Sequence, residues 1–221
     1  SYSVRVRSTD AGGLFTEKPF TIVVTNVNEA PTDITLSSAT VAENAPPGST
    51  VGTLSTSDPD AGETFTYTLV PGVGDGDNAA FTIAGNVLQA AAAFNFEARN
   101  TYGIRVRSTD ALGLVAEKSF TIAVTNVNEA PADITLAPAA IAENNPAGAA
   151  VGAFATADVD AGNTFTYVLV AGQGDADNAS FQVLGNQLKA TASFNFEDRN
   201  SYSIRIRSTD QGGLATEKAF T

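Results

Sequence analysis

The sequence predicts an all-β chain of tandem β-sandwich domains, and two observations indicate this fold class. First, the chain is self-similar at a period of about one hundred residues: the string RSTD begins at Arg7, Arg107 and Arg207, and FNFE begins at Phe94 and Phe194. Second, apolar and polar residues alternate along most segments, which is the pattern of half-buried strands. A repeat of this length can bury its own core, so we expect independent domains in tandem.

Eight short strands are expected in the complete repeat. Their sequences are rich in Thr, Val, Ile, Phe and Tyr, and turn sequences such as DPDAG and GDGDN separate them. Gln89 to Ala93 is predicted to be strand plus loop and not helix, because it is short and lacks a cap. About seven strands per domain is typical of an immunoglobulin-like sandwich. The expected strands are 33–36, 40–43, 50–56, 64–70, 80–84, 87–90, 101–108 and 114–125.

The phase of the repeat sets the expected domain boundaries. Residues 1–21 correspond to 101–121 and again to 201–221. A window cut from a longer array is the simpler interpretation, and a strand-donating subunit is the alternative. We expect the C-terminal strands of a preceding, truncated repeat at 1–29, a complete repeat at 30–129, and a repeat lacking its last strand end at 130–221.

The composition excludes several classes of function. The chain has no Cys and no His, so it offers no disulfide, thiol nucleophile, imidazole base or usual transition-metal site. Its 24 acidic residues outnumber 12 Lys and Arg, which argues against nucleic acid and anionic lipid surfaces and favours cations. No segment approaches the length of a membrane span and no signal peptide is visible. We therefore expect neither nucleic-acid binding nor direct membrane insertion.

The acidic residues collect in five motifs: AEN, DPD, FNFE, STD and NVNEAP. Strand parity in a sandwich brings the end of one repeat toward the start of the next. Like charges that converge there cost on the order of 1 kcal/mol per pair in water. Such an all-oxygen cluster calls for a cation and suits calcium better than magnesium or a transition metal. The carboxylates expected to converge are Glu43, Glu97, Glu129, Asp158, Asp160 and Asp210.

These five motifs, in this order, resemble those of the extracellular cadherin repeat, and the match covers essentially the whole chain. The short NVNEAP form and the absence of Cys are similar to cadherin-like arrays of bacterial surface and secreted proteins. The resemblance implies cadherin-like sandwiches, an extracellular location and calcium at each junction between repeats. It implies bridging carboxylates from Glu43 and Glu97, a linker carboxylate from Glu129, a side-chain oxygen from Asn128, backbone oxygens from Val127, Ala130 and Asn163, and closing carboxylates from Asp158, Asp160 and Asp210.

The resemblance also implies two partial sites and one weakened position. Asn95 replaces an Asp of the family pattern, so we expect two firmly held ions per junction and not three. One partial set lies near the N-terminus, and the other awaits a linker beyond Thr221. The N-terminal set is Asn28, Glu29, Asp58, Asp60 and Asp110, and the C-terminal set is Glu143 and Glu197.

Three other groups have plainer interpretations. Asp75, Asp77 and Asn78 fit a loop role, with a separate weak calcium site as the alternative. The strand arginines near 105–107 are expected to be solvated and paired with neighbouring acids. Phe94 and Phe96 are expected to be core or lid residues, and a sugar-stacking platform lacks any Trp.

Together these features predict a calcium-rigidified segment of an extracellular adhesin stalk or fibre. The alternative is a carbohydrate-binding or homophilic cell-adhesion module. The expected partners are neighbouring repeats of the same long chain, and in the alternative other copies of the chain or a polysaccharide. An enzyme such as a glycosidase would need two acids across an open cleft, so no enzymatic activity is expected.

Overall fold

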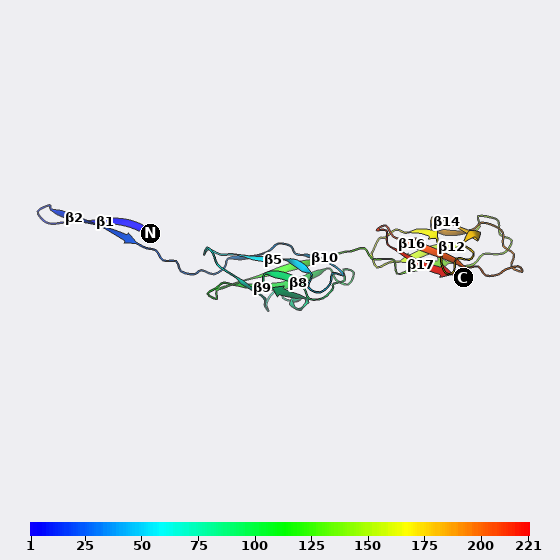
Figure 1. Cartoon of the computed structure of the whole chain (residues 1–221), viewed down its shortest axis with the longest axis horizontal. Helices are drawn as coiled ribbons and strands as arrows, with labels where there is room; N and C mark the ends of the chain where they lie inside the picture. Colours follow the sequence, from blue (N-terminus) through cyan, green and yellow to red (C-terminus); the bar gives the residue numbers. More distant parts are fainter. The chain divides into compact units, whose positions relative to one another are not determined.

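The computed structural model describes residues 1–221 and confirms the all-β fold (Figure 1). The chain forms β-strands throughout, with two single-turn 3₁₀-helices, η1 (Asn78–Ala80) and η2 (Asn178–Ser180). All the strands expected in the complete repeat are present, and their bounds differ from the expected ones by about one or two residues. Gln89 to Ala93 is strand up to Ala90 and loop beyond it, as predicted.

The contacts within the chain divide it into two compact units. The first comprises residues 1–41, 45–93 and 101–123, and the second comprises 42–44, 94–100 and 124–221. The short segments that carry Glu43 and Glu97 therefore group with the sandwich that follows residue 130. This grouping matters for the site, because the expected acidic cluster lies entirely within the second unit.

The N-terminal residues form an antiparallel hairpin. Strand β1 (Tyr2–Thr9) pairs with β2 (Phe15–Ile22), with Tyr2 opposite Ile22 and Val4 opposite Phe20. These apolar side chains are exposed. The residues equivalent to Val4 and Val6 in the next repeat, Ile104 and Val106, are buried in a sandwich core.

The complete repeat forms a sandwich of two four-stranded sheets. Alternate residues of each strand face inward, as the sequence period predicts. Ile34, Leu54 and Leu88 from one sheet and Ile104 and Ile122 from the other are almost completely buried. In one sheet the strand order is β3 (Asp33–Leu36), β5 (Thr50–Ser57), β8 (Val87–Ala90), β7 (Phe81–Ala84). In the other sheet it is β4 (Thr40–Ala42), β10 (Val115–Thr125), β9 (Thr101–Thr109), β6 (Thr66–Leu69).

The second sandwich has seven strands in two sheets. Its core includes Ile134, Phe154, Leu188 and Ile206. In the four-stranded sheet the order is β11 (Asp133–Ala137), β12 (Ala150–Ala157), β15 (Gln187–Ala190), β14 (Phe181–Leu184). In the three-stranded sheet it is β13 (Thr166–Leu169), β16 (Ile204–Thr209), β17 (Ala215–Phe220).

No strand equivalent to β4 forms in the second sandwich, although the repeat predicts one near 140–143. In the first sandwich the backbone N–H of Ala123 donates to the Ala39 carbonyl, and that of Glu43 donates to Thr125. In the second sandwich residues 140–143 form no strand, and β17 (Ala215–Phe220) has no such neighbour in its sheet.

The GDGDN loop is held by its own polar side chains. Asp75 accepts from the backbone N–H of Gly72 at 2.9 Å, and Asp77 accepts from Gly103 at 2.7 Å. The Asn78 amide donates to the Val70 carbonyl at 2.9 Å. These bonds fasten the 3₁₀ turn to its neighbours and favour the loop role over a separate calcium site.

A ladder of ion pairs lines the outer face of β9 and β10. Arg105 and Arg107 each contact a different oxygen of Glu117, at 2.9 and 2.7 Å. The hydrogen bonds from Arg107 and then Arg105 hold the pKa of the Glu117 carboxyl below its ordinary value. Glu217 repeats this arrangement with Arg207 and Arg205. The strand arginines are thus paired with acids, as expected.

The ladder predicts a pH-dependent contribution to stability. Because the pKa of Glu117 is depressed in the folded chain, its contribution is present above the ordinary value of 4.5 and is lost as pH falls through the lower folded pKa. Glu117→Gln should lower the melting temperature by roughly 1–2 °C at pH 7, since exposed pairs contribute little. Melting curves should show this difference disappearing at the acid end. An equal difference at all pH values would contradict the ion-pair explanation.

Candidate metal centre

The segment that follows β10 lies against two aspartates of the second sandwich. The Asn126 amide donates to Asp160 Oδ1 at 2.8 Å, and the backbone N–H of Glu129 donates to Asp160 Oδ2 at 2.8 Å. The Asn128 amide donates to Asp210 Oδ2 at 2.9 Å. Asp160 and Asp210 are both buried. The NVNE part of the linker motif and two of the predicted closing aspartates are therefore brought together.

Glu43 connects three segments of the same compact unit. Its side chain is only 2% exposed. Oε1 accepts from the backbone N–H of Val127 and Oε2 from that of Phe96, both at 2.8 Å. Its own N–H donates to the Thr125 carbonyl. A buried carboxylate with these donors fixes the AEN, FNFE and NVNEAP motifs together.

Three carboxylates meet at this point. Ligand atoms of Glu43, Glu97 and Glu129 all lie within 4.8 Å of one another. A backbone hydrogen bond within Glu97 lowers its pKa, but desolvation and the charges of Glu43, Glu129 and Asp160 outweigh it. The net result is a raised pKa for the Glu97 carboxyl, to which desolvation contributes most and the neighbouring negative charges add.

Two buried carboxylate oxygens in this region have no hydrogen-bond partner. Glu129 Oε1 accepts from the Asn44 amide at 2.6 Å, and Asp158 Oδ1 accepts from the backbone N–H of Asp160 at 2.9 Å. The other oxygens, Glu129 Oε2 and Asp158 Oδ2, are buried and unpartnered. Unpartnered buried carboxylate oxygens are costly unless a cation satisfies them. The donor set, which is entirely oxygen, could hold calcium.

The same pattern occurs around the first NVNEAP motif, within the first unit. The Asn26 amide donates to Asp60, and the Asn28 amide donates to Asp110 Oδ2 at 2.8 Å. The backbone N–H of Glu29 donates to Asp60 Oδ2 at 2.8 Å, and Asp58 Oδ2 is buried and unpartnered. The N-terminal set is thus assembled in the same way on the sandwich side.

Hydrogen bonds from the linker amides explain three pKa shifts. The Asn26 amide lowers the pKa of Asp60, and the Asn28 amide lowers the pKa of Asp110. Burial raises the pKa of Asp210, but the bonds from Asn128 and from nearby backbone N–H groups bring it below its ordinary value. These aspartates are therefore stabilised in the charged form without any basic residue.

Three participating side chains were missed from the sequence. Asn44 holds Glu129 from a backbone with φ of 57°, a conformation that Asn tolerates better than most residues. Asn126 was not among the residues predicted for the site, because the family pattern gave it no role. Glu63 has a buried, unpartnered Oε2 and stands where the next repeat has Asn163. The negative charge of Glu63, in the loop that follows the DPD motif, was the sequence feature that could have indicated it.

Some predicted residues are not brought into a cluster. Glu143 is exposed and accepts one bond from Phe196 N–H, at 3.2 Å, and Glu197 is also exposed. The side-chain oxygen of Asn95 accepts from the Ala98 N–H at 2.6 Å, so it closes a local turn. Phe94 is buried, as expected of a core residue.

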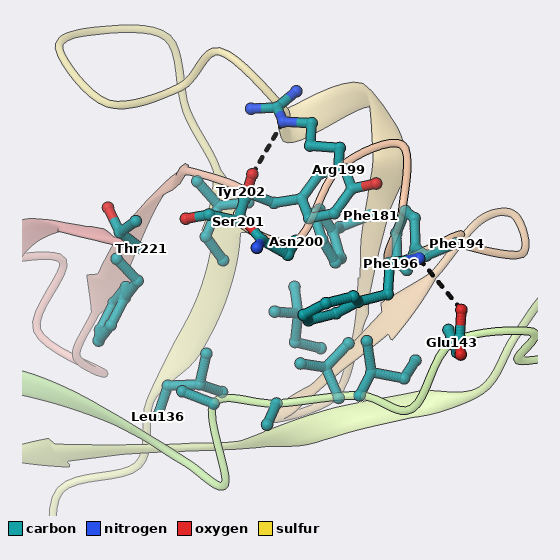
Figure 2. A pocket seen from close by; sticks show the side chains of 17 residues that line it. Leu136, Glu143, Phe181, Phe194, Phe196, Arg199, Asn200, Ser201, Tyr202 and Thr221 are labelled. Carbon is teal, nitrogen blue, oxygen red and sulfur yellow. Dashed lines mark hydrogen bonds between the residues drawn. The ribbon is translucent and has the colours of Figure 1, made fainter.

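The second sandwich also contains an apolar cavity of about 400 Å³. Figure 2 shows Phe181, Phe194 and Tyr202 around it, with Glu143 near one side. Core residues such as Leu188 and Ile204 line it. None of Glu43, Glu97 and Glu129 is among its lining residues, so the cavity is separate from the acidic cluster around Glu129.

Comparisons with known proteins agree with this architecture. No known protein-family model matches the chain. Among curated proteins, human protocadherin gamma-A1 is 28% identical over 229 residues, which cover 96% of this chain and 24% of that protein. Human protocadherin Fat 4 is 28% identical over 225 residues, covering 96% of this chain and 4% of the relative. The chain thus spans about a quarter or less of the length of these relatives.

Solved structures show the same fold. The protocadherin gamma B4 extracellular domain matches with a TM-score of 0.64 and 24% identity, over 99% of this chain and 37% of that one. Human protocadherin-24 EC1-2 matches with a TM-score of 0.62 and 20% identity, over 88% of this chain and 94% of that one. The chain therefore has the fold of cadherin extracellular domains, as the motifs predicted. It contains no helix long and apolar enough to cross a membrane.

The raised pKa of Glu97 generates a prediction for the metal-free chain. A raised folded pKa means that the charged carboxylate destabilises the fold above that pKa and that the penalty disappears as pH falls through it. Glu97→Gln should therefore raise the melting temperature in chelator at pH 7, by roughly 1–2 °C for an exposed group. Glu197→Gln is the matched control, since Glu197 is exposed and outside the cluster. A lower melting temperature for Glu97→Gln would contradict the repulsion.

Proposed function

We propose that the cluster around Glu129 binds calcium and that the chain is a calcium-rigidified segment of an extracellular adhesin. The observation that carries this proposal is the convergence of Glu43, Glu97 and Glu129, of which Glu129 keeps a buried, unpartnered Oε2. The buried, unpartnered Oδ2 of Asp158 supports it. No basic side chain forms a salt bridge with Glu43, Glu97 or Glu129. A multivalent cation is the natural counter-charge for such a set.

Some proposed ligands keep a free oxygen, and the others would bind the metal through an oxygen that already accepts one hydrogen bond, since a carboxylate oxygen has two lone pairs. Asn128 uses its amide nitrogen on Asp210, which leaves its side-chain oxygen for the metal. Asn95 is a weaker ligand because it is uncharged and its oxygen caps a turn, so two firmly held ions are proposed. The proposed set is Glu43, Asn95, Glu97, Val127, Asn128, Glu129, Ala130, Asp158, Asp160, Asn163 and Asp210.

Partial sets are proposed at the two ends of the chain. Around the first NVNEAP motif, Asp58 Oδ2 and Glu63 Oε2 are buried and unpartnered, which supports a weaker site there. Glu143 and Glu197 would need acidic residues beyond Thr221 to complete a site. The N-terminal set is Asn28, Glu29, Asp58, Asp60 and Asp110.

The mechanical role follows from where the ligands lie in the sequence. We propose the repeat boundaries at 1–29, 30–129 and 130–221, so that the ligands come from two successive repeats and the segment joining them. In the absence of metal the glutamates repel one another. Bound calcium would supply the positive charge that lets these carboxylates remain together. Extracellular modules bind calcium with dissociation constants of about 10⁻⁴ to 10⁻³ M, which suits a segment that is rigid outside the cell.

Self-association is the second candidate. One similar structure, of protocadherin gammaB7 EC3-6, is described as a cis-dimer, and the relatives named above are protocadherins. Homophilic contact between copies of this chain would be compatible with calcium-rigidified repeats. None of the likenesses involves a polysaccharide, so carbohydrate binding is not proposed. The proposed role is mechanical and adhesive, with no enzymatic step. A bacterial surface origin is also proposed, and only the sequence motifs support it.

Isothermal titration of the chain with calcium tests the proposal. Saturable heat in the millimolar range or tighter is expected, and magnesium should produce a much weaker response because it prefers small octahedral sites. Asp158→Ala removes one unpartnered oxygen and should weaken binding at the main site by at least about tenfold, which is the usual scale for losing a charged ligand.

Asp175→Asn provides the control. Asp175 accepts a backbone N–H in the turn loop and takes no part in the cluster. Its replacement should leave the calcium affinity unchanged. If this variant lost calcium binding and Asp158→Ala retained it, the metal would bind the turn loop and the proposed site would be wrong. No heat for the unchanged chain at millimolar calcium would also contradict the proposal.

A further inference from the structure

The acids of the candidate centre fall into two groups that differ in their hydrogen bonds. Asp160 and Asp210 are each 6% exposed, yet each has both oxygens satisfied. Asp160 accepts from the Asn126 amide and the Glu129 N–H, and Asp210 accepts from the Leu214 N–H and the Asn128 amide. Glu129 and Asp158, in contrast, each keep one buried oxygen without a partner. The need for a cation is thus confined to one part of the centre.

The donors to the satisfied aspartates are neutral amides. An asparagine has almost the shape of an aspartate but donates where an aspartate could only repel. A carboxylate in the place of Asn126 would face Asp160 with a like charge at hydrogen-bond distance. The amide instead stabilises the buried charge and adds none of its own.

The arrangement occurs twice, in separate compact units. Asn26 and Asn28 donate to Asp60 and Asp110 as Asn126 and Asn128 donate to Asp160 and Asp210, and the Glu29 N–H reaches Asp60 at 2.8 Å. Two independent copies with the same bonds make an accidental side-chain placement a poor explanation. The bonds of the first copy are formed only by residues of its linker and of the sandwich that follows it.

Packing around Asn128 supports the same role. Gly212 lies so close to it that a Cβ at this position would fall 2.6 Å from the Asn128 amide nitrogen. The side chain of Asn128 therefore fills the space that a larger residue at 212 would occupy. Leu112 stands at the equivalent position in the other repeat, so this close packing is specific to the second copy.

We propose that Asn126 and Asn128 hold the segment 126–129 against Asp160 and Asp210 without a metal ion, so that calcium is needed only at the other carboxylates of the centre, those of Glu43, Glu97, Glu129 and Asp158. The amides act as positioning residues that keep the linker end of the centre formed in advance. The role assigned to calcium rests on the function proposed above. The metal-free docking of residues 126–129 does not rest on that proposed function.

Amide hydrogen exchange in chelator tests this inference directly. The Glu129 N–H donates to Asp160 and reports the docking. In the unchanged chain it should be protected in chelator, and Asn126→Asp with Asn128→Asp should reduce protection by about tenfold to a hundredfold, the factor that a hydrogen bond to a charged group is typically worth. Calcium should restore protection in the double variant, because the added carboxylates can bind it.

The two copies control for each other. Asn26→Asp with Asn28→Asp should release the Glu29 N–H and leave that of Glu129 unchanged. Unaltered exchange in β12 and β16 would show that each variant is folded. Free exchange of the Glu129 N–H in the unchanged chain in chelator would overturn the inference, as would equal protection in the double variant. Failure of calcium to bind would contradict the proposed function and leave the chelator comparison as the test of docking.

Discussion

Repulsion among the carboxylates of Glu43, Glu97 and Glu129 is the constraint on which the rest of the candidate centre depends. Their ligand atoms lie within 4.8 Å of one another. The carboxylate of Glu43 is buried, and two backbone N–H donors hold it in place. The fold therefore forces negative charge together where no basic side chain is paired with it. Elsewhere the chain balances its acids directly, as Glu117 and Glu217 do with strand arginines. The contrast separates acids that stabilise the sandwiches from acids kept free for a ligand.

The sandwiches provide the rigid support for this arrangement. Asp110 and Asp210 directly follow the strands β9 and β16, in which the nearby Ser108 and Ser208 are fully buried, so each aspartate is placed by a core strand. The linker amides then bring the NVNE segment onto those aspartates. Glu43 directly follows the short strand β4, which pairs with β10, and its own N–H donates to the Thr125 carbonyl at the end of β10. The pairing of the strands thus determines where the carboxylates of the candidate centre lie, and the sequence motifs determine which positions carry a charge.

Much of this could be predicted from the sequence. The alternating pattern and the turn motifs were sufficient for the strands, because side-chain burial in a sheet follows a period of two. The carboxylates at 43, 97, 129, 158, 160 and 210 were predicted as ligands because five acidic motifs recur in a fixed order along the repeat. Asn44 and Asn126 could not be found in this way, since their function depends on which atom points toward a carboxylate. The absence of a strand at 140–143 was not predicted, because pairing with another strand, and not local sequence alone, decides whether a short segment forms a strand.

The central claim is that metal binding at the Glu129 cluster restrains the chain, and a spin-label distance measurement tests it most directly. The chain has no cysteine, so Thr82→Cys and Gln182→Cys, at equivalent exposed positions of the two units, can be labelled alone. The account predicts a broad distance distribution in chelator that becomes narrow in millimolar calcium, and that stays broad when Asp158→Ala is added. The same distribution with and without calcium would contradict it.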